Sequence, residues 1–190
     1  MSSLARSCRT LAVGIVAAAA IVSMTQVADA APAGLSLPLD SPIAVDTATN
    51  EVFLVGHAKG FQIYTCNGAT STWGPASTPD AKLFDDNGEL VAKHFAGPTW
   101  EAKDGSAVKG TVTGRVDSPT PATAIPWLRL STTPVPGSPG GLLTKTTFIQ
   151  RVATTGGVAP TAGCNSNTAG KKEKVPYSAD YYFWEAKASA

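Results

Sequence analysis

The chain has 190 residues, of which 15 are basic and 14 acidic, and this length suits one domain with a sizeable core. Two of the basic residues and one acidic residue lie in the first thirty positions, so the remainder holds 13 of each and is formally neutral. Nucleic acids and anionic membranes are bound by excess positive charge, so neither is an expected partner.

Residues 1–30 have the features of a cleavable signal peptide. Two arginines precede the uncharged stretch 10–28, and residues 28–30 are Ala-Asp-Ala, the small-x-small pattern that a signal peptidase accepts. An uncleaved membrane anchor is the alternative, since the apolar stretch is nearly long enough to span a bilayer. The cleavage pattern favours removal. We therefore expect residues 31–190 to be secreted as a single β domain, with no stable membrane insertion after cleavage.

Two cysteines remain after the leader, because Cys8 lies within it. Exported proteins meet an oxidising compartment, so Cys66 and Cys164 are predicted to form one disulfide. Two buried free thiols are the alternative. A zinc site that adds His57 and His94 is disfavoured, because no two of these residues have the close spacing of structural zinc ligands. No metal is expected.

Short β-rich runs separated by Gly, Pro and Asn clusters follow one another from about residue 50, and no long amphipathic helix interrupts them. The predicted strand runs are residues 52–55, 61–64, 81–84, 90–95, 100–103, 108–112, 125–130, 142–152 and 181–184. Eight or nine strands without helices predict an all-β, single-domain antiparallel β-sandwich or barrel with long loops.

Three turns are predicted to join neighbouring runs as hairpins. Residues 56–60 begin and end with glycines that can adopt positive φ, which predicts a first hairpin with His57 at its tip. Residues 85–88 end in Asn-Gly and residues 104–105 are Asp-Gly, two strong hairpin signals. Residues 154–176 form a long Gly- and Lys-rich segment, which the expected disulfide would hold against the body.

No cofactor is implied by the sequence, because the common nucleotide, serine-hydrolase and zinc-protease signatures do not occur in it. The chain has two histidines, so any acid-base chemistry that uses imidazole must involve His57 or His94. At its hairpin tip, His57 needs no explanation beyond exposure. Catalytic residues are left open.

The segment 94–101 is the strongest candidate for a site. A tight turn at residues 96–97 would place His94 opposite Thr99, with Glu101 as a diagonal neighbour on the same face, about 7–8 Å away. Imidazole and carboxylate at this distance could act as an acid-base pair. The alternative is that His94 only packs in phase with the apolar residues before it.

Tryptophans offer a second kind of contact, because aromatic faces can bind a sugar. Trp73, Trp100 and Trp127 are the candidates, with Trp73 expected to be the most exposed, and core packing is the alternative for each. The candidate ligand-binding residues are His57, His94, Trp100 and Glu101.

Four blocks of sequence carry a resemblance to a known family. They are residues 57–66 (HAKGFQIYTC), 94–101 (HFAGPTWE), 148–157 (FIQRV followed by TTGG after one residue) and 176–183 (PY followed by ADYYF after one residue). In this order they resemble domain of unknown function 3455, over about residues 39–186. The resemblance implies a secreted bacterial or fungal protein and supplies no activity.

These observations favour an extracellular or envelope-associated binding module that takes a small or carbohydrate-like ligand near His94, Trp100 and Glu101. A small hydrolase or lyase that uses His94 and Glu101 is one alternative. A structural envelope protein is the other. The oligomeric state is left open.

Overall fold

The computed structural model describes residues 37–38 and 40–188, so the predicted signal peptide lies outside the described residues. The elements in chain order are β1 (Asn50–Asn67), β2 (Thr72–Trp73), β3 (Thr78–Phe84), β4 (Leu90–Phe95), β5 (Thr99–Ala102), β6 (Ala107–Val116), β7 (Trp127–Pro134), β8 (Thr146–Gly156), η1 (Ser166–Thr168) and β9 (Lys172–Ala186). Among the residues described, no helix is long and apolar enough to cross a membrane.

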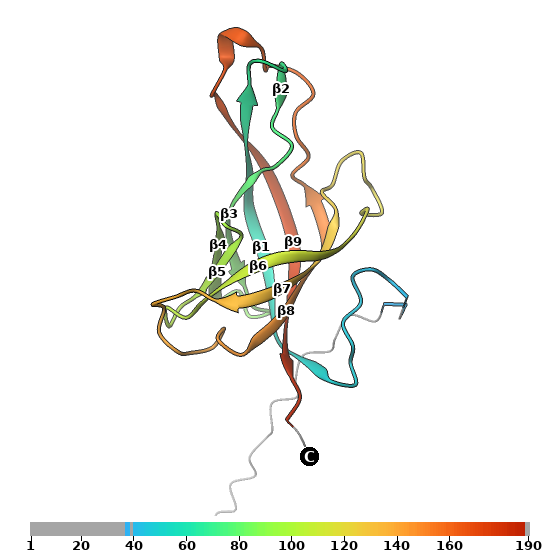
Figure 1. Cartoon of the computed structure of the whole chain (residues 1–190), viewed down its shortest axis with the longest axis vertical. Coiled ribbons are helices and arrows are strands. Elements are labelled where there is room, and N and C mark those ends of the chain that lie inside the picture. The colour runs from blue at the N-terminus through green and yellow to red at the C-terminus, as the bar shows by residue number, and fades with distance from the viewer. Residues whose placement is uncertain (1–36, 39, 189–190) are drawn as a thin grey trace, which may run out of the picture. The chain divides into compact units, whose positions relative to one another are not determined.

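Eight of the strands close into an antiparallel barrel. The sheet order is β2-β1-β3-β4-β5-β6-β7-β8-β9, and β1 also pairs with β9 along most of its length. That last pairing joins the two ends of the sheet, while β2 remains an extra strand on β1 (Figure 1). The all-β antiparallel prediction is therefore confirmed, and of its two forms the barrel is the one observed. Closure leaves no open edge among the eight strands.

The predicted hairpin at residues 56–60 is wrong, because β1 runs through these residues as one strand of 18 residues. Neither glycine has positive φ. Gly60 is needed for a different reason, since a Cβ atom there would lie 2.2 Å from the backbone oxygen of Asp80 on β3. Glycine lets two strands approach closely, and this use replaces the turn that was predicted.

The other two predicted hairpins are confirmed. Gly88 and Gly105 have φ of 80° and 83°, as their turns require. In the first turn, the Asp85 carboxylate accepts hydrogen bonds from the backbone amides of Asn87 and Glu89 at 3.0 and 2.8 Å. These local bonds fix the connection from β3 to β4 and, with it, the position of the β4–β5 hairpin that carries the candidate site.

Beyond the barrel, the end of β1, β2, η1 and the start of β9 form an extension that we call the arm, residues 64–76 and 158–173 (Figure 1). The predicted disulfide is present in it, with the Cys66 and Cys164 Cα atoms 5.3 Å apart. The bridge packs with Tyr64 and Trp73 in a small buried cluster. The disulfide holds residues 154–176, the segment that was predicted to be a long loop. The loop is shorter than predicted, because β9 already begins at Lys172.

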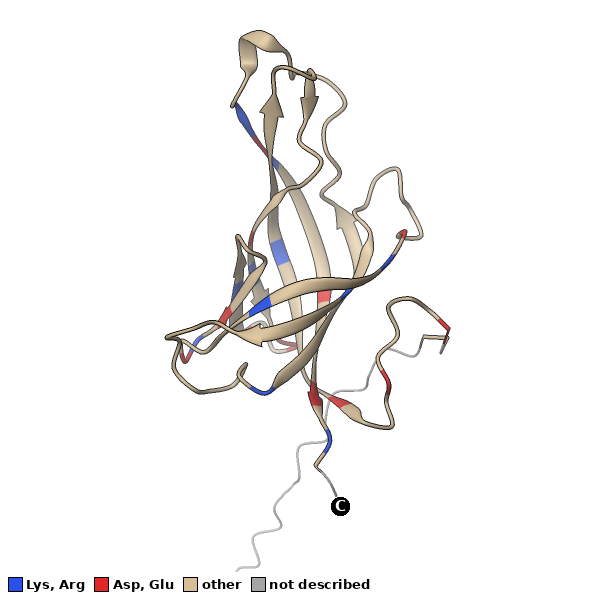
Figure 2. Ribbon diagram, in the orientation of Figure 1, with Lys and Arg blue, Asp and Glu red and all other residues tan. Residues whose placement is uncertain are grey.

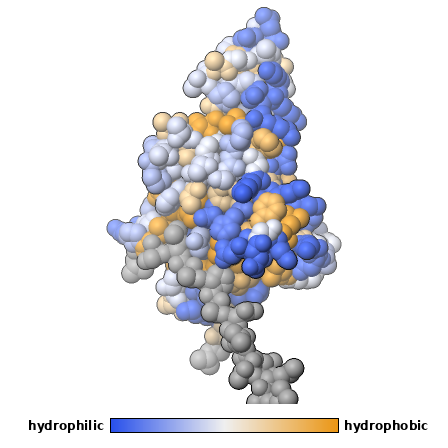
Figure 3. All heavy atoms as spheres, turned by 180° about the vertical axis from the view of Figure 1, so that it is seen from behind, coloured by the Kyte–Doolittle hydropathy of each residue, from blue (hydrophilic) through white to orange (hydrophobic). Residues whose placement is uncertain are grey.

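The main core lies inside the barrel, and a second layer covers part of its outer wall. In that layer Val45, from the segment before β1, packs with Val52 and Trp184. Charged residues of both signs are scattered over the strands, and neither sign gathers on one face in the view of Figure 2. Seen from behind, apolar residues form separate patches between hydrophilic ones (Figure 3).

Candidate functional site

A cavity of about 240 Å³ opens into the interior of the barrel. Its rim includes Ser77, Pro98 and Val112, which come from the link before β3, the β4–β5 turn and β6. Its inner wall is formed by Gln62, His94, Trp100, Arg151 and Tyr181, which belong to five different strands. An eight-stranded barrel is just wide enough for side chains or for one small ligand, and here the side chains leave part of the interior empty.

Three aromatic rings form one side of this wall. The His94 and Trp100 rings are stacked, with centroids 4.1 Å apart and an angle of 8° between their planes. Tyr181 approaches both rings edge-on, at 5.3 Å from His94 and 5.6 Å from Trp100. Edge-on and stacked contacts of this kind stabilise aromatic pairs beyond the burial of their area. The wall is therefore a fixed surface.

The imidazole of His94 is neutral. Burial lowers its pKa from 6.5 to about 3, with a smaller lowering from the charge of Arg151, while the contact with the Thr99 carbonyl acts in the opposite direction. Its Nδ1 lies 3.0 Å from that carbonyl oxygen, which only accepts, so Nδ1 carries the proton. Nε2 then has a lone pair and can accept a hydrogen bond.

Two buried hydrogen-bond donors of the wall have no partner. Four buried side-chain polar atoms of the described residues are unpaired, and among them are Gln62 Nε2 and Trp100 Nε1. Gln62 is 2% exposed and Trp100 is 1% exposed, so bulk water does not serve these N–H groups. The Oε1 atom of Gln62 accepts from the Ser77 hydroxyl, which directs its amide nitrogen away from Ser77. A buried donor without a partner costs about 1–3 kcal/mol.

Arg151 adds a positive charge at the same wall. Its Nε and Nη2 atoms donate to the Pro126 carbonyl oxygen at 3.2 and 2.8 Å, which fixes the plane of the guanidinium group. None of the ion pairs among the described residues includes Arg151. Burial raises the pKa of Tyr181 next to it, so this hydroxyl remains protonated.

The predicted pairing of His94 with Thr99 is wrong by one residue. His94 lies opposite Trp100, and Glu101 lies opposite Lys93. Successive side chains of a strand point to opposite faces, so Glu101 is on the outer face of the barrel while His94 points inward. The structure thus brings His94 and Trp100 together and separates Glu101 from them, which removes the basis for a shared acid-base pair.

The reason for the shift is Pro98. A two-residue turn at residues 96–97 would pair residue 98 with Phe95, and proline has no N–H for that ladder. The observed loop has three residues and pairs Phe95 with Thr99. Gly97 takes φ of 123° in this loop.

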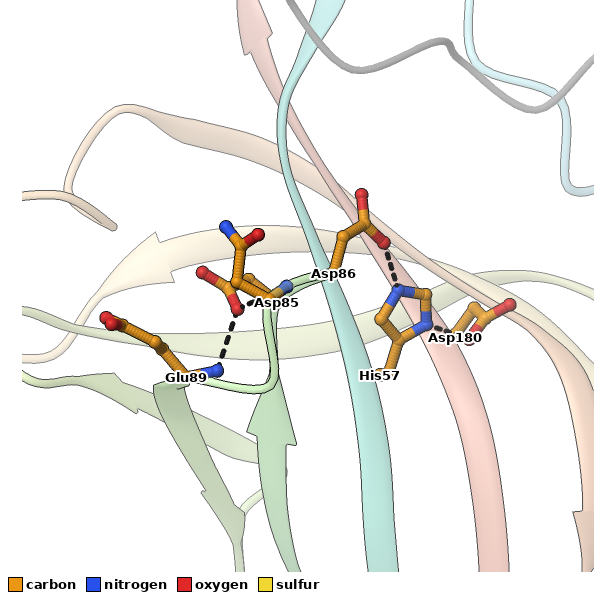
Figure 4. A network of polar contacts seen from close by, with 6 residues as sticks. His57, Asp85, Asp86, Glu89 and Asp180 are labelled. Carbon is orange, nitrogen blue, oxygen red and sulfur yellow. Dashed lines mark hydrogen bonds and ion pairs between the residues drawn. The ribbon is translucent and has the colours of Figure 1, made fainter.

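His57 lies within β1 on the outer face and not at a hairpin tip as predicted, and it is held between two carboxylates (Figure 4). Nδ1 is 2.7 Å from Asp180 Oδ1 on β9, and Nε2 is 2.8 Å from Asp86 Oδ1 in the β3–β4 turn. The hydrogen bond with Asp180, then that with Asp86, raise its pKa above 6.5. Both ring nitrogens are occupied, so this cluster joins three segments of chain and leaves no nitrogen for a substrate.

Gln62, Arg151 and Tyr181 were not predicted as site residues. A signal existed, because Gln62 alternates in phase with buried Ala58 and Tyr64 along β1, and a polar residue at a core position is informative. Trp73 is a further correction, since it is buried in the arm and its Nε1 donates to the Ala162 carbonyl at 2.8 Å. Among the described residues, no three His, Cys, Asp or Glu side chains are grouped so that they could hold a metal ion.

The fold and this cavity define a class: a small, closed antiparallel barrel with an aromatic, donor-lined interior. A family model described as "Protein of unknown function (DUF3455)" matches residues 47–185. The chain belongs to this family, so the resemblance stated from its sequence blocks is confirmed. No curated protein and no solved structure matches the chain.

Proposed function

We propose that the protein binds a small organic molecule inside the barrel, with His94 and Trp100 in contact with the ligand. The observation that carries this proposal is a cavity of about 240 Å³ that opens into the barrel, and its lining includes Gln62 and Trp100, each of which has one unpaired buried donor. Native proteins keep few buried polar atoms without partners, and each calls for an explanation. Neighbouring side chains cover both donor atoms, so the acceptor atoms of a ligand reach them only when these side chains shift.

The composition of the cavity supports the same function. Ligand sites are concave and mostly apolar, with a few polar groups that fix orientation. Leu128 and Leu130 contribute apolar surface here, and the aromatic wall is rigid through its stacking. The volume equals that of about eight water molecules at ~30 Å³ each, which limits the ligand to roughly one ring with its substituents.

We also propose that binding takes place outside the cytoplasm. The disulfide between Cys66 and Cys164 supports this, since such bridges persist in oxidising compartments. The predicted leader at residues 1–30 supports it independently. Expression of the full chain in a secreting bacterial host, followed by N-terminal sequencing of the exported protein, tests it. The expected first residue is Ala31, and a product that stays in the cytoplasm with residues 1–30 attached contradicts it.

Two neighbouring substitutions test the cavity as the binding site. Val112 lies at the rim and is 52% exposed, so Val112→Trp places an indole across the opening with little cost to the core. Thr111→Trp is the matched control, because the adjacent exposed position faces the opposite side of the sheet. Benzyl alcohol, benzamide, benzoate and glucose serve as probes in saturation-transfer NMR. At least one should bind the wild type and Thr111→Trp but not Val112→Trp.

Binding that survives Val112→Trp would place the ligand elsewhere and overturn the proposal. If none of the probes binds the folded wild type, the small-molecule role is also overturned and the structural role becomes the better account. Glucose is included because the sequence left a carbohydrate open. Circular dichroism confirms that both tryptophan variants are folded.

A further inference from the structure

The geometry points to a carboxylate as the group that the cavity recognises. This inference rests on the proposed function and names the class of ligand: a small organic acid with one flat apolar ring. Two features of the cavity carry it, namely an arginine without an acidic partner and a lining that contains no carboxylate.

The charge at the wall is one-sided. Arg151 is charged, His94 is neutral because of its low pKa, and no aspartate or glutamate is among the residues that line the cavity. A buried or half-buried guanidinium is ordinarily paired with a carboxylate. Here none of the described carboxylates forms an ion pair with Arg151. An anionic ligand supplies the missing charge, whereas a cationic ligand meets repulsion.

The geometry of Arg151 suits a two-oxygen group. Its Nε and Nη2 edge is occupied by the Pro126 carbonyl oxygen. The end of the fork, formed by Nη1 and the second hydrogen of Nη2, meets no carboxylate among the described residues, and the Tyr181 hydroxyl lies beside the guanidinium group. Guanidinium binds carboxylate through two parallel N–H···O bonds along such an edge. Because the Pro126 contact already fixes the plane, little side-chain entropy remains to be lost on binding.

The neutral part of the lining is compatible with the same chemistry. The Tyr181 hydroxyl remains protonated, as burial raises its pKa, and it lies 3.4 Å from the Tyr177 hydroxyl and beside the Arg151 guanidinium group. Val112, Leu128 and Leu130 give the cavity its apolar surface. Ligand sites combine such apolar surface with a few polar groups that fix orientation, which suits a small acid with one apolar ring.

Three isosteric probes test the inference by charge alone: benzoate, benzamide and benzamidinium. The oxidised mature chain, residues 31–190, is titrated with each at pH 7 and constant ionic strength, with saturation-transfer NMR and the shift in Tm as readouts. Hydrogen bonds to charged groups are stronger than neutral ones, so benzoate should bind at least about tenfold more tightly than benzamide. Benzamidinium should not compete with either.

Variants of two arginines identify the group responsible. Arg151→Gln should abolish the preference, so that benzoate binds no more tightly than benzamide does. Arg115→Gln is the matched control, because this substitution removes the same charge from an exposed position of β6. Arg151→Lys, which keeps the charge without the fork, should retain a partial preference and covers the case in which Arg151→Gln does not fold.

The outcomes separate this inference from the proposed function. Equal binding of benzoate and benzamide, blocked by Val112→Trp, overturns the carboxylate and leaves the cavity as a small-molecule site. A preference for benzoate that persists in folded Arg151→Gln or Arg151→Lys without reduction also overturns it. Absence of all binding to the folded wild type overturns both proposals.

Discussion

Trp73 in the arm and Trp100 in the barrel are both buried, yet only one of their indole N–H groups has a hydrogen-bond partner. Trp73 Nε1 donates to the Ala162 carbonyl at 2.8 Å, whereas Trp100 Nε1 has no partner. The arm also pairs the Tyr64 hydroxyl with the Gly157 carbonyl and closes its loop with the disulfide. The buried polar groups of these arm residues therefore all have partners within the protein. The barrel interior keeps empty volume and unpaired donors, which is the difference expected between a structural cluster and a binding site.

The largest effect is expected from removing the bridge in the arm. The bridge joins residues 98 positions apart, so Cys66→Ser with Cys164→Ser should lower the free energy of unfolding by up to about 4.7 kcal/mol. Urea unfolding at 25 °C measures this loss. If the arm is only structural, benzoate binding to the folded double variant should be unchanged. Loss of binding in a folded double variant would show that the arm belongs to the site.

The two tryptophans can be compared directly by Trp73→Phe and Trp100→Phe. Both changes remove similar ring volume, so the difference between them reports the indole N–H. Trp73→Phe leaves the Ala162 carbonyl without its donor and should destabilise the protein by about 1–3 kcal/mol more than Trp100→Phe does, because the latter removes an unpaired donor. Thermal or urea unfolding gives both values. Equal losses would mean that Trp100 Nε1 has a partner in solution.

The sequence predicted this contrast only in part. Features that depend on a few neighbouring residues could be predicted, whereas features that depend on distant parts of the chain could not. The turns at Gly88 and Gly105 could be predicted because their chemistry is contained in a few neighbouring residues. Gly60 was misread because a glycine permits either a turn or a close approach, and only the position of β3 decides between them. The cysteine pair followed from composition, whereas the packing of Trp73 against it depends on residues far along the chain.

For the site, the sequence identified the correct hairpin but the wrong neighbour of His94. The observed register differs from the predicted one by one residue, so Trp100 and not Glu101 lies on the same face as His94. The reason is that successive side chains of a strand point to opposite faces. Gln62, Arg151 and Tyr181 come from three other strands, and their meeting is a result of barrel closure. No local pattern contains that information, although the in-phase position of Gln62 was a usable signal.

The buried histidine gives an effect that is small at neutral pH and grows as the pH falls. The pKa of His94 is about 3 in the folded protein and 6.5 as its ordinary value, so the unfolded chain binds a proton between these limits and the folded protein does not. The stabilisation is therefore present above pH 6.5 and is lost as the pH falls toward 3, by on the order of 1 kcal/mol for each pH unit. Comparison of wild type with His94→Gln by urea unfolding at pH 7 and pH 4 isolates this residue. Parallel losses in both proteins would contradict a neutral, buried His94.

His57 on the outer face should show the opposite sign and the smallest effect. Its pKa is raised above 6.5, first by the hydrogen bond with Asp180 and then by that with Asp86, so its stabilisation is present below pH 6.5 and is lost as the pH rises through the folded pKa. The side chain is 38% exposed, and Asp86 is 90% exposed, so solvent screening limits the contribution to below about 1 kcal/mol.

NMR titration of the His57 ring measures the pKa directly. Asp180→Asn should lower it more than Asp86→Asn does, because Asp180 is the less exposed partner at 33% and makes the larger contribution. Two results would contradict this account: a larger fall of the His57 pKa in Asp86→Asn than in Asp180→Asn, or a wild-type pKa below 6.5. Either would mean that the two carboxylates do not hold the ring in solution, so the outer wall would lack this connection between β1, β9 and the β3–β4 turn.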